Sequence, residues 1–292
     1  MSPAERAVGA VGAVAVTVDR WRDPPPPPLS TRTRALLGLV TAFGLVAFLW
    51  PFLARPDGNA QLAHSGDAPF VFAVMIPLLL AVVVSEVAEG GLDAKAVALM
   101  GVLAAAGAAL RLAGAGVSGF EAAFFLLIPA GRVFGKAFGF VLGCLTLFVS
   151  ALLTGGVGPW LPFQMLGAAW IGFGAGCLPA LRGRAEVWML AGYGVVVGLA
   201  YGLLLNLWFW PWASGMAGGV SFVPGDPVGA NLGRYGAFYL ATSLGWDIPR
   251  ALTNAVLMVL AGPALLRALR RTSRRAAFGE VGEFGPAGAG GD

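Results

Sequence analysis

Long runs of uncharged, mostly apolar residues alternate with short charged segments along this chain. The runs cover residues 35–54, 68–85, 96–110, 122–131, 137–181, 187–225 and 251–266. An α-helix rises about 1.5 Å per residue, so about 20 residues span the roughly 30 Å hydrocarbon layer of a membrane. Runs of about that length therefore predict membrane-spanning helices.

The two longest runs are predicted to break at glycine and proline. In the first, residues 155–159 (GGVGP) cannot continue a helix, and Pro162 is typical of a first helical turn. This predicts helices near 137–153 and 161–178. In the second, Pro211 and the Gly/Pro-rich stretch after it limit the helix to about 187–209 and leave 210–246 as a long loop.

The short segment 120–131 decides the predicted topology. If it crosses the membrane and the N-terminus is cytoplasmic, about eight helices cross, and only Arg55, Arg111, Arg234 and Arg250 of the basic residues lie outside. If it does not cross, the basic cluster at 267–275 falls outside, and most Lys and Arg residues no longer lie on the cytoplasmic side. Lys and Arg favour the cytoplasmic side, so we expect about eight crossings with both termini cytoplasmic.

Composition supports the membrane interpretation. Of the 292 residues, 58% are apolar and 12% are charged, against about 45–50% and about 25% in soluble proteins. Such a chain cannot cover its surface with polar groups, which argues against a soluble enzyme. The net charge of +4 is explained by the positive-inside bias rather than by nucleic-acid binding.

The predicted outer half is rich in aromatic and amide side chains. Its tryptophans are Trp160, Trp170, Trp208, Trp210, Trp212 and Trp246. They could form an interfacial aromatic belt or line a pocket for a flat or bulky ligand. Gln164, Asn206 and Asn231 favour the pocket, because amides near a membrane surface need partners and can bind an uncharged ligand.

Few residues suggest chemistry. Glu86, Arg111, Glu121 and Arg250 are expected near helix ends, where their side chains reach water, and Asp226 and Asp247 in solvated loops. The sequence contains no Ser-His-Asp set, phosphate-binding glycine motif or metal-ligand spacing. We therefore expect no enzymatic activity, no cofactor and no ATP site in this chain.

Small residues form stripes on several predicted helices. One helix carries two of them, Gly101/Ala105/Ala109 and Ala104/Ala108, and glycines at 167–176 and 192–202 thin two later helices. Small residues allow close helix packing, which is the expected role of the Gly-rich helices. The alanine stripe could instead dock another membrane protein.

Three segments carry a resemblance to a known family. They are 101–111 (GVLAAAGAALR), 132–143 (RVFGKAFGFVLG) and 155–165 (GGVGPWLPFQM). Together they resemble the substrate-binding (S) component of energy-coupling factor (ECF) vitamin transporters, in a branch of actinobacterial type. The similarity extends over about residues 97–267.

The resemblance implies a fold and a division of the chain. It implies an all-α integral membrane protein of the plasma membrane, with a six-helix S-component-like core at 96–268. Two additional N-terminal transmembrane helices would occupy 34–95. A cytoplasmic tail with a Pro-rich spacer would occupy 1–33, and a basic, then Gly-rich, cytoplasmic tail 269–292.

The resemblance also implies roles. The chain would bind a vitamin from outside, with cobalamin favoured over riboflavin or a thiamine precursor, and dock on a transmembrane coupling protein that carries two ATPase subunits. The implied ligand residues are Arg111, Trp160, Gln164, Asn206, Trp208 and Trp212. The implied docking residues are Ala104 with Ala108, or Ala105 with Ala109. A stand-alone secondary transporter and a structural membrane protein remain the alternatives.

Overall fold

The computed structural model describes residues 29–53, 60–88, 94–114, 121–212 and 219–280, and every ordered element in them is a helix. The predictions for residues 1–28 and 281–292 and for the side chains of Glu86 and Trp212 lie outside this part. Residues 269–280, expected to belong to a C-terminal tail, are helical. The helices are α2 (Thr31–Leu53), α3 (Ala60–Ala88), α4 (Ala94–Ala113), α5 (Ala123–Phe134), α6 (Lys136–Thr154), α7 (Leu161–Ala175), α8 (Gly183–Phe209), η1 (Trp210–Trp212), α9 (Val228–Thr242), α10 (Leu244–Leu260) and α11 (Gly262–Glu280).

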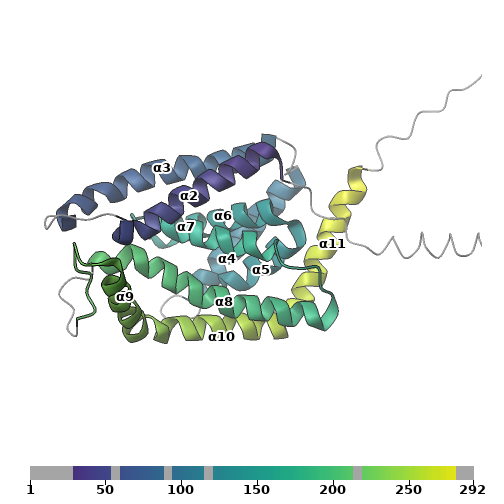
Figure 1. Ribbon diagram of the computed structural model, residues 1–292. Helices are drawn as coiled ribbons and strands as arrows, with labels where there is room; N and C mark the ends of the chain where they lie inside the picture. Colours follow the sequence, from purple (N-terminus) through teal and green to yellow (C-terminus); the bar gives the residue numbers. More distant parts are fainter. Residues whose placement is uncertain (1–28, 54–59, 89–93, 115–120, 213–218, 281–292) are drawn as a thin grey trace, which may run out of the picture.

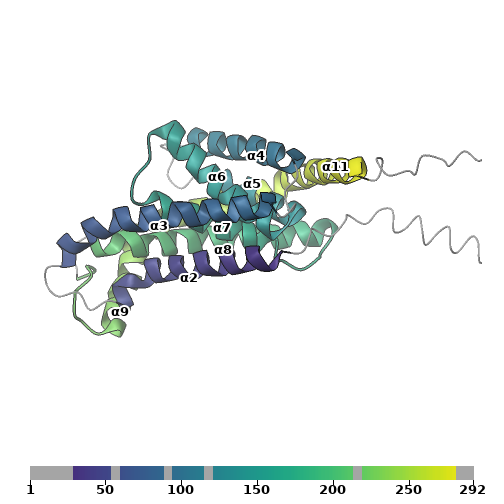
Figure 2. The ribbon, with the colours of Figure 1, turned by 90° about the horizontal axis from the view of Figure 1, so that it is seen from above.

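Most of these helices run lengthwise in one elongated bundle (Figure 1), with α9 across one end and α11 across the other. Seen from above, α4 and α6 lie on one side and α2 on the other (Figure 2). The centre is made by α5, α6 and α7, which pack on one another, while α8 packs on α10. The two N-terminal helices belong to this body, since Phe48 of α2 packs edge-on against Phe163 of α7.

Several helices suit a membrane. Four of them, α2, α4, α6 and α8, are long and apolar enough to span one, and α10 with α11 reach that length and hydropathy only as a bent pair, which is either a broken span or a re-entrant loop. Residues 73–85 of α3 and the helix α5 are shorter apolar segments. This architecture is compatible with a multi-pass membrane protein.

Two sequence predictions of helix boundaries are wrong. The run 251–266, expected as one helix, is split between α10 and α11, which meet at an angle of 66°. Pro263 explains the break, because it lacks the N–H that would continue the hydrogen-bond ladder. The expected loop 210–246 contains α9, whose buried face carries Asn231, Tyr235 and Phe238 at helical spacing. By contrast, the predicted break at 155–159 is confirmed, with Gly155 in the left-handed conformation at the end of α6.

Glycines set the closest helix contacts. A Cβ added to Gly172 of α7 would lie 2.0 Å from the carbonyl oxygen of Gly139 in α6, and one added to Gly131 of α5 would lie 2.1 Å from the carbonyl oxygen of Gly172. Gly198 of α8 approaches the backbone of Ala251 in the same way. Internal packing, expected for the Gly-rich helices, is therefore confirmed at these positions.

Replacing Gly172 by alanine should destabilise the protein. The added methyl group meets backbone atoms that cannot rotate away, and such overpacking costs about 1–3 kcal/mol. Gly192→Ala is the matched control, because nothing lies within 4 Å of its added Cβ and alanine is the better helix former. Thermal unfolding of the detergent-purified variants should show a lower midpoint for Gly172→Ala alone; equal midpoints would contradict this account of the packing.

Candidate functional site: a buried ionic cluster beside an aromatic group

Four charged side chains meet inside the bundle. They are Arg111 in the last turn of α4, Glu121 just before α5, and Asp247 and Arg250 in the first half of α10. We call them the Glu121 cluster. Arg111 Nε donates to Glu121 Oε1 at 3.1 Å, and Arg250 Nε donates to Glu121 Oε2 at 2.9 Å. The carboxylate of Glu121 thus joins the end of α4 and the segment before α5 to α10, which is distant in sequence.

The cluster is buried and balanced in charge. The side chains of Glu121 and Arg250 are each 14% exposed, and that of Asp247 is 2% exposed and paired with Arg250. Arg111 is the most accessible member, at 25%. Isolated charges in an apolar interior are very costly, and pairing with hydrogen bonds offsets much of that cost. Two acids and two bases therefore make a local arrangement that an apolar bundle can hold.

Neutral polar side chains make further hydrogen bonds to the residues of this cluster. Arg111 donates from Nη1 to Ser150 Oγ at 3.2 Å and from Nη2 to Gln164 Oε1 at 3.5 Å. Asn254 Nδ2 donates to the backbone oxygens of Glu121, at 3.2 Å, and of Arg250, at 2.8 Å. The bonds from Arg111 fix the orientation of its guanidinium group, and the bonds from Asn254 tie the segment that leads into α5 to α10.

The cluster lies well inside the bundle rather than at its end. Arg250 Nη1 donates to the carbonyl oxygen of Gly198, which sits near the middle of the 27-residue helix α8. The expectation that Glu121 and Arg250 reach water from helix ends is therefore wrong. The expectation that Asp247 is a solvated loop residue is also wrong, since it lies in the first turn of α10 against Gly202.

Glycine at position 202 makes room for Asp247. A Cβ added there would lie 1.9 Å from Asp247 Oδ2, so any larger residue in α8 would displace this carboxylate. Only a glycine lets α8 and α10 approach closely enough to bury the acid beside Arg250.

Some polar atoms around the cluster have no partner among the described residues. Tyr201 Oη, Asp247 Oδ2 and Asn254 Oδ1 are buried without a hydrogen bond. The ring of Tyr201 lies under the guanidinium of Arg250, 5.4 Å from its Cζ, and packs edge-on against Phe124. Buried polar atoms are normally satisfied, so this is a place where a water molecule or a polar group of a ligand would gain hydrogen bonds.

Four of the sequence-predicted site residues come together at the start of α7. Trp160 and Trp208 contact each other with ring centroids 6.3 Å apart, and Trp208 also packs on Phe163 at 5.8 Å. Gln164 follows Trp160 by one turn and bonds Arg111 of the Glu121 cluster. Trp160 is 40% exposed. An accessible aromatic surface thus lies beside the buried charges.

Asn206, the remaining predicted ligand residue that the structure describes, makes a hydrogen bond that holds two helices together. Asn206 Nδ2 donates to Ser243 Oγ at 2.5 Å, which ties the end of α8 to the junction of α9 and α10. Asn231 likewise pins the loop before α9 through two bonds to the backbone of Val223. Trp210 is fully buried, and its Nε1 donates to the carbonyl of Val220. These three side chains hold the end of the bundle together.

The two predicted docking stripes lie on different faces of α4, one buried and one exposed. Ala104 and Ala108 are buried, at 2% and 0% exposure, on the side that packs against α6. Ala105 and Ala109 are exposed, next to Val102 at 67% exposure. Only the second pair is accessible for contact with another protein.

Sequence reasoning singled out Arg111 and Gln164 but not Glu121, Asp247 or Arg250 as parts of one site. Their opposite charges within apolar stretches are the signal that could have grouped them, because charges at membrane depth must pair. Among the described residues, no cluster of histidine, cysteine, aspartate and glutamate could hold a metal ion.

Comparison of the chain with protein-family models, with curated proteins and with solved structures finds no match.

Neutralising Glu121 should strongly destabilise the fold. Glu121→Gln leaves Arg250, 14% exposed, and Arg111, 25% exposed, without their shared counter-charge, and breaking a buried ion pair costs about 3–5 kcal/mol. Asp226→Asn is the control. Asp226 pairs with Arg234, and their side chains are 36% and 27% exposed, respectively; exposed ion pairs contribute about 0–1 kcal/mol. Thermal unfolding should show a much larger drop in midpoint for Glu121→Gln; similar small drops would contradict the role given to the cluster.

Proposed function

We propose that this chain is the membrane-embedded substrate-specificity subunit of an ECF-type importer, which binds a vitamin from the outer side. The proposal rests on the sequence resemblance. The observation that carries it is the grouping of Trp160, Trp208, Gln164 and Arg111 beside buried polar atoms that lack partners. Aromatic faces with a few fixed polar groups are typical of small-molecule sites.

The proposed topology has about eight crossings in the plasma membrane, with both termini cytoplasmic. In it, α5 passes through only the inner part of the bilayer, because its 12 residues extend about 18 Å. The helix α11, with Arg267, Arg270, Arg271 and Arg274, then lies along the cytoplasmic surface, as basic amphipathic helices do. The aromatic pair Trp160 and Trp208 and the Glu121 cluster belong to the outer half of the bilayer.

In the proposed mechanism this chain selects the ligand and other subunits supply the energy. The flat ring system of the vitamin would stack on Trp160 and Trp208, and Gln164 and Arg111 would donate hydrogen bonds to its polar edge. Cobalamin is the preferred ligand, and riboflavin or a thiamine precursor are the others to test. The chain itself would be neither an enzyme nor an ATP-binding protein.

The partners would be a transmembrane coupling protein and two ATPase subunits. The exposed stripe of Ala105 and Ala109 is the proposed docking face, since small residues let another helix approach closely and separate again. Ala104 and Ala108 are assigned to packing against α6, because both are buried there.

A stand-alone secondary transporter is the second candidate, and one observation favours it. Glu121 and Asp247 are carboxylates held deep in the bundle, and buried acids in membrane proteins often serve ion or proton coupling. The two functions differ in whether uptake needs an ATPase module.

A panel of vitamins tests the proposed binding function. A ligand present at 100 times its dissociation constant should stabilise the folded chain by about 2.7 kcal/mol, which raises the thermal midpoint in detergent. Trp208→Ala should weaken this shift, because a stacking surface is lost. Trp188→Ala should retain it, since Trp188 lies near the start of α8, far from Trp208 at its other end. Absence of a shift with every vitamin would contradict the proposal.

Substitution on the exposed stripe tests the proposed docking function. Ala105→Leu should abolish vitamin uptake by the assembled transporter while the vitamin still raises the thermal midpoint of the isolated chain. Ala200→Leu, an equally large change at an exposed position of α8, should leave uptake intact. Unchanged uptake by Ala105→Leu, or loss of vitamin binding, would show that this face does not dock a partner.

A further inference from the structure

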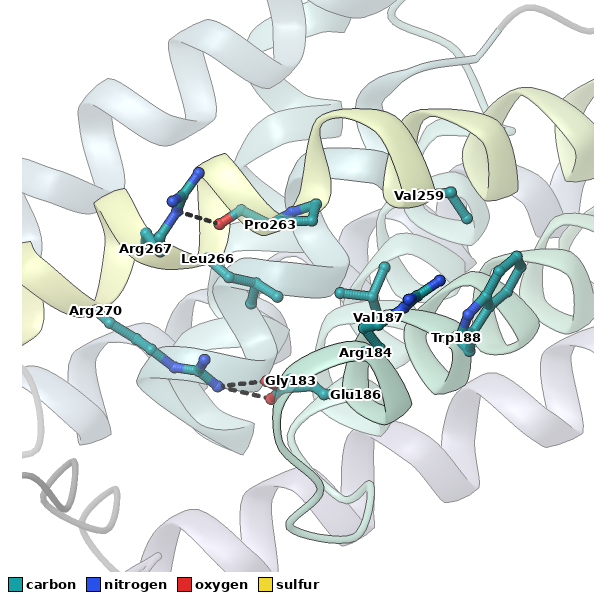
Figure 3. A pocket seen from close by; sticks show the side chains of 10 residues that line it. All are labelled: Gly183, Arg184, Glu186, Val187, Trp188, Val259, Pro263, Leu266, Arg267 and Arg270. Atoms are coloured by element: carbon teal, nitrogen blue, oxygen red, sulfur yellow. Dashed lines mark hydrogen bonds and ion pairs between the residues drawn. The ribbon is translucent and has the colours of Figure 1, made fainter.

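A pocket opens at the end of the bundle where α10 bends into α11. Its volume is about 520 Å³, and it lies between the first turns of α8 and the bend. Figure 3 shows that its lining combines arginines of α8 and α11 with apolar side chains. The arginines are Arg184, Arg267 and Arg270.

Glu186, the acid among the described residues that line this pocket, is already neutralised. Glu186, 1% exposed, accepts hydrogen bonds from Arg132 Nε at 2.9 Å and from Arg270 Nη2 at 2.7 Å. Figure 3 shows Arg270 reaching across from α11 to this carboxylate. With one negative charge between two positive ones, and with Arg184 and Arg267 nearby, the pocket carries a net positive charge.

The start of α8 adds to this positive character. Its N-cap residue, Arg182, is extended and makes no side-chain cap hydrogen bond, so the first-turn N–H groups lack that partner. Gly183 and Arg184, at this helix start, line the pocket. Uncapped helix N-termini favour anions, phosphate in particular.

The surface next to the pocket is apolar. Trp188 lines it at 61% exposure, with Val187, Val259 and Leu266, and Leu260 at the bend is 76% exposed. An exposed tryptophan between an arginine group and apolar side chains is typical of the membrane interface. The ligand that suits both halves has a phosphate head and hydrocarbon chains.

We propose that this pocket binds the headgroup of an anionic phospholipid such as phosphatidylglycerol. The phosphate would lie among Arg184, Arg267 and the start of α8, and the acyl chains would follow Trp188 and Leu260 along α8 and α10. Basic pockets between helices on the cytoplasmic side of membrane proteins recognise such lipids. This site is separate from the proposed vitamin site, so either can fail without the other.

Native mass spectrometry of the full chain in an uncharged detergent tests the site. Phosphatidylglycerol should bind more tightly than phosphatidylcholine. The double variant Arg184→Gln/Arg267→Gln should lower that affinity about 25-fold, at about fivefold for each arginine. Arg271→Gln is the control for one lost arginine, because it removes a single positive charge from an exposed position of α11 that does not line the pocket. It should bind phosphatidylglycerol normally.

Two further experiments test whether a loss of binding comes from misfolding and whether the site recognises the lipid or phosphate alone. Arg184→Lys/Arg267→Lys keeps both charges and should retain most of the binding, which excludes misfolding as the cause of a loss. Inorganic phosphate, added in excess, should displace little of the lipid, because it lacks the acyl chains. Equal binding of both lipids, equal loss with Arg271→Gln, or full displacement by inorganic phosphate would each overturn the proposal.

Discussion

The structure depends on one carboxylate held between two guanidinium groups in an apolar interior. Glu121 accepts from Arg111 on one side and Arg250 on the other, so helices α4 and α10 are fixed to the segment that leads into α5. Charges in such surroundings are tolerated only when paired and hydrogen-bonded. Ser150 and Gln164 accept further hydrogen bonds from Arg111, and Asn254 donates to the backbone oxygen of Glu121, so side chains of five segments meet in one place.

The other end of α5 repeats the arrangement. Arg132 in its last turn bonds Glu186 of α8, which also accepts from Arg270 of α11. Between the two clusters, Gly131 lies against Gly172 at backbone distance. The short helix α5 is therefore held at both ends by ion pairs and in its second half by close glycine packing. The proposed vitamin site lies beside the first cluster and the proposed lipid site beside the second. The helix α5 therefore connects two sites of different chemistry.

The sequence predicts where the helices lie better than it predicts which helices contact one another. Apolar runs and the GGVGP break located most helices, because a membrane-length helix and a glycine–proline turn are local properties. The helix α9 was missed because glycines at 229, 233 and 236 disguise its periodicity, and the bend at Pro263 because the surrounding run is apolar throughout. Arg111 and Gln164 were anticipated in one site. Glu121 and Arg250 were not joined, because they are 129 positions apart and charge alone does not show which helices touch.

Uptake of labelled vitamin into cells that lack their own transporter tests the central claim most directly. The host would express this chain alone, or together with a coupling protein and two ATPase subunits of an ECF transporter. The account predicts binding at the cell surface in both cases and accumulation inside only when the ATPases are present and active. Accumulation by the chain alone, driven by an ion gradient, would contradict it and identify a secondary transporter.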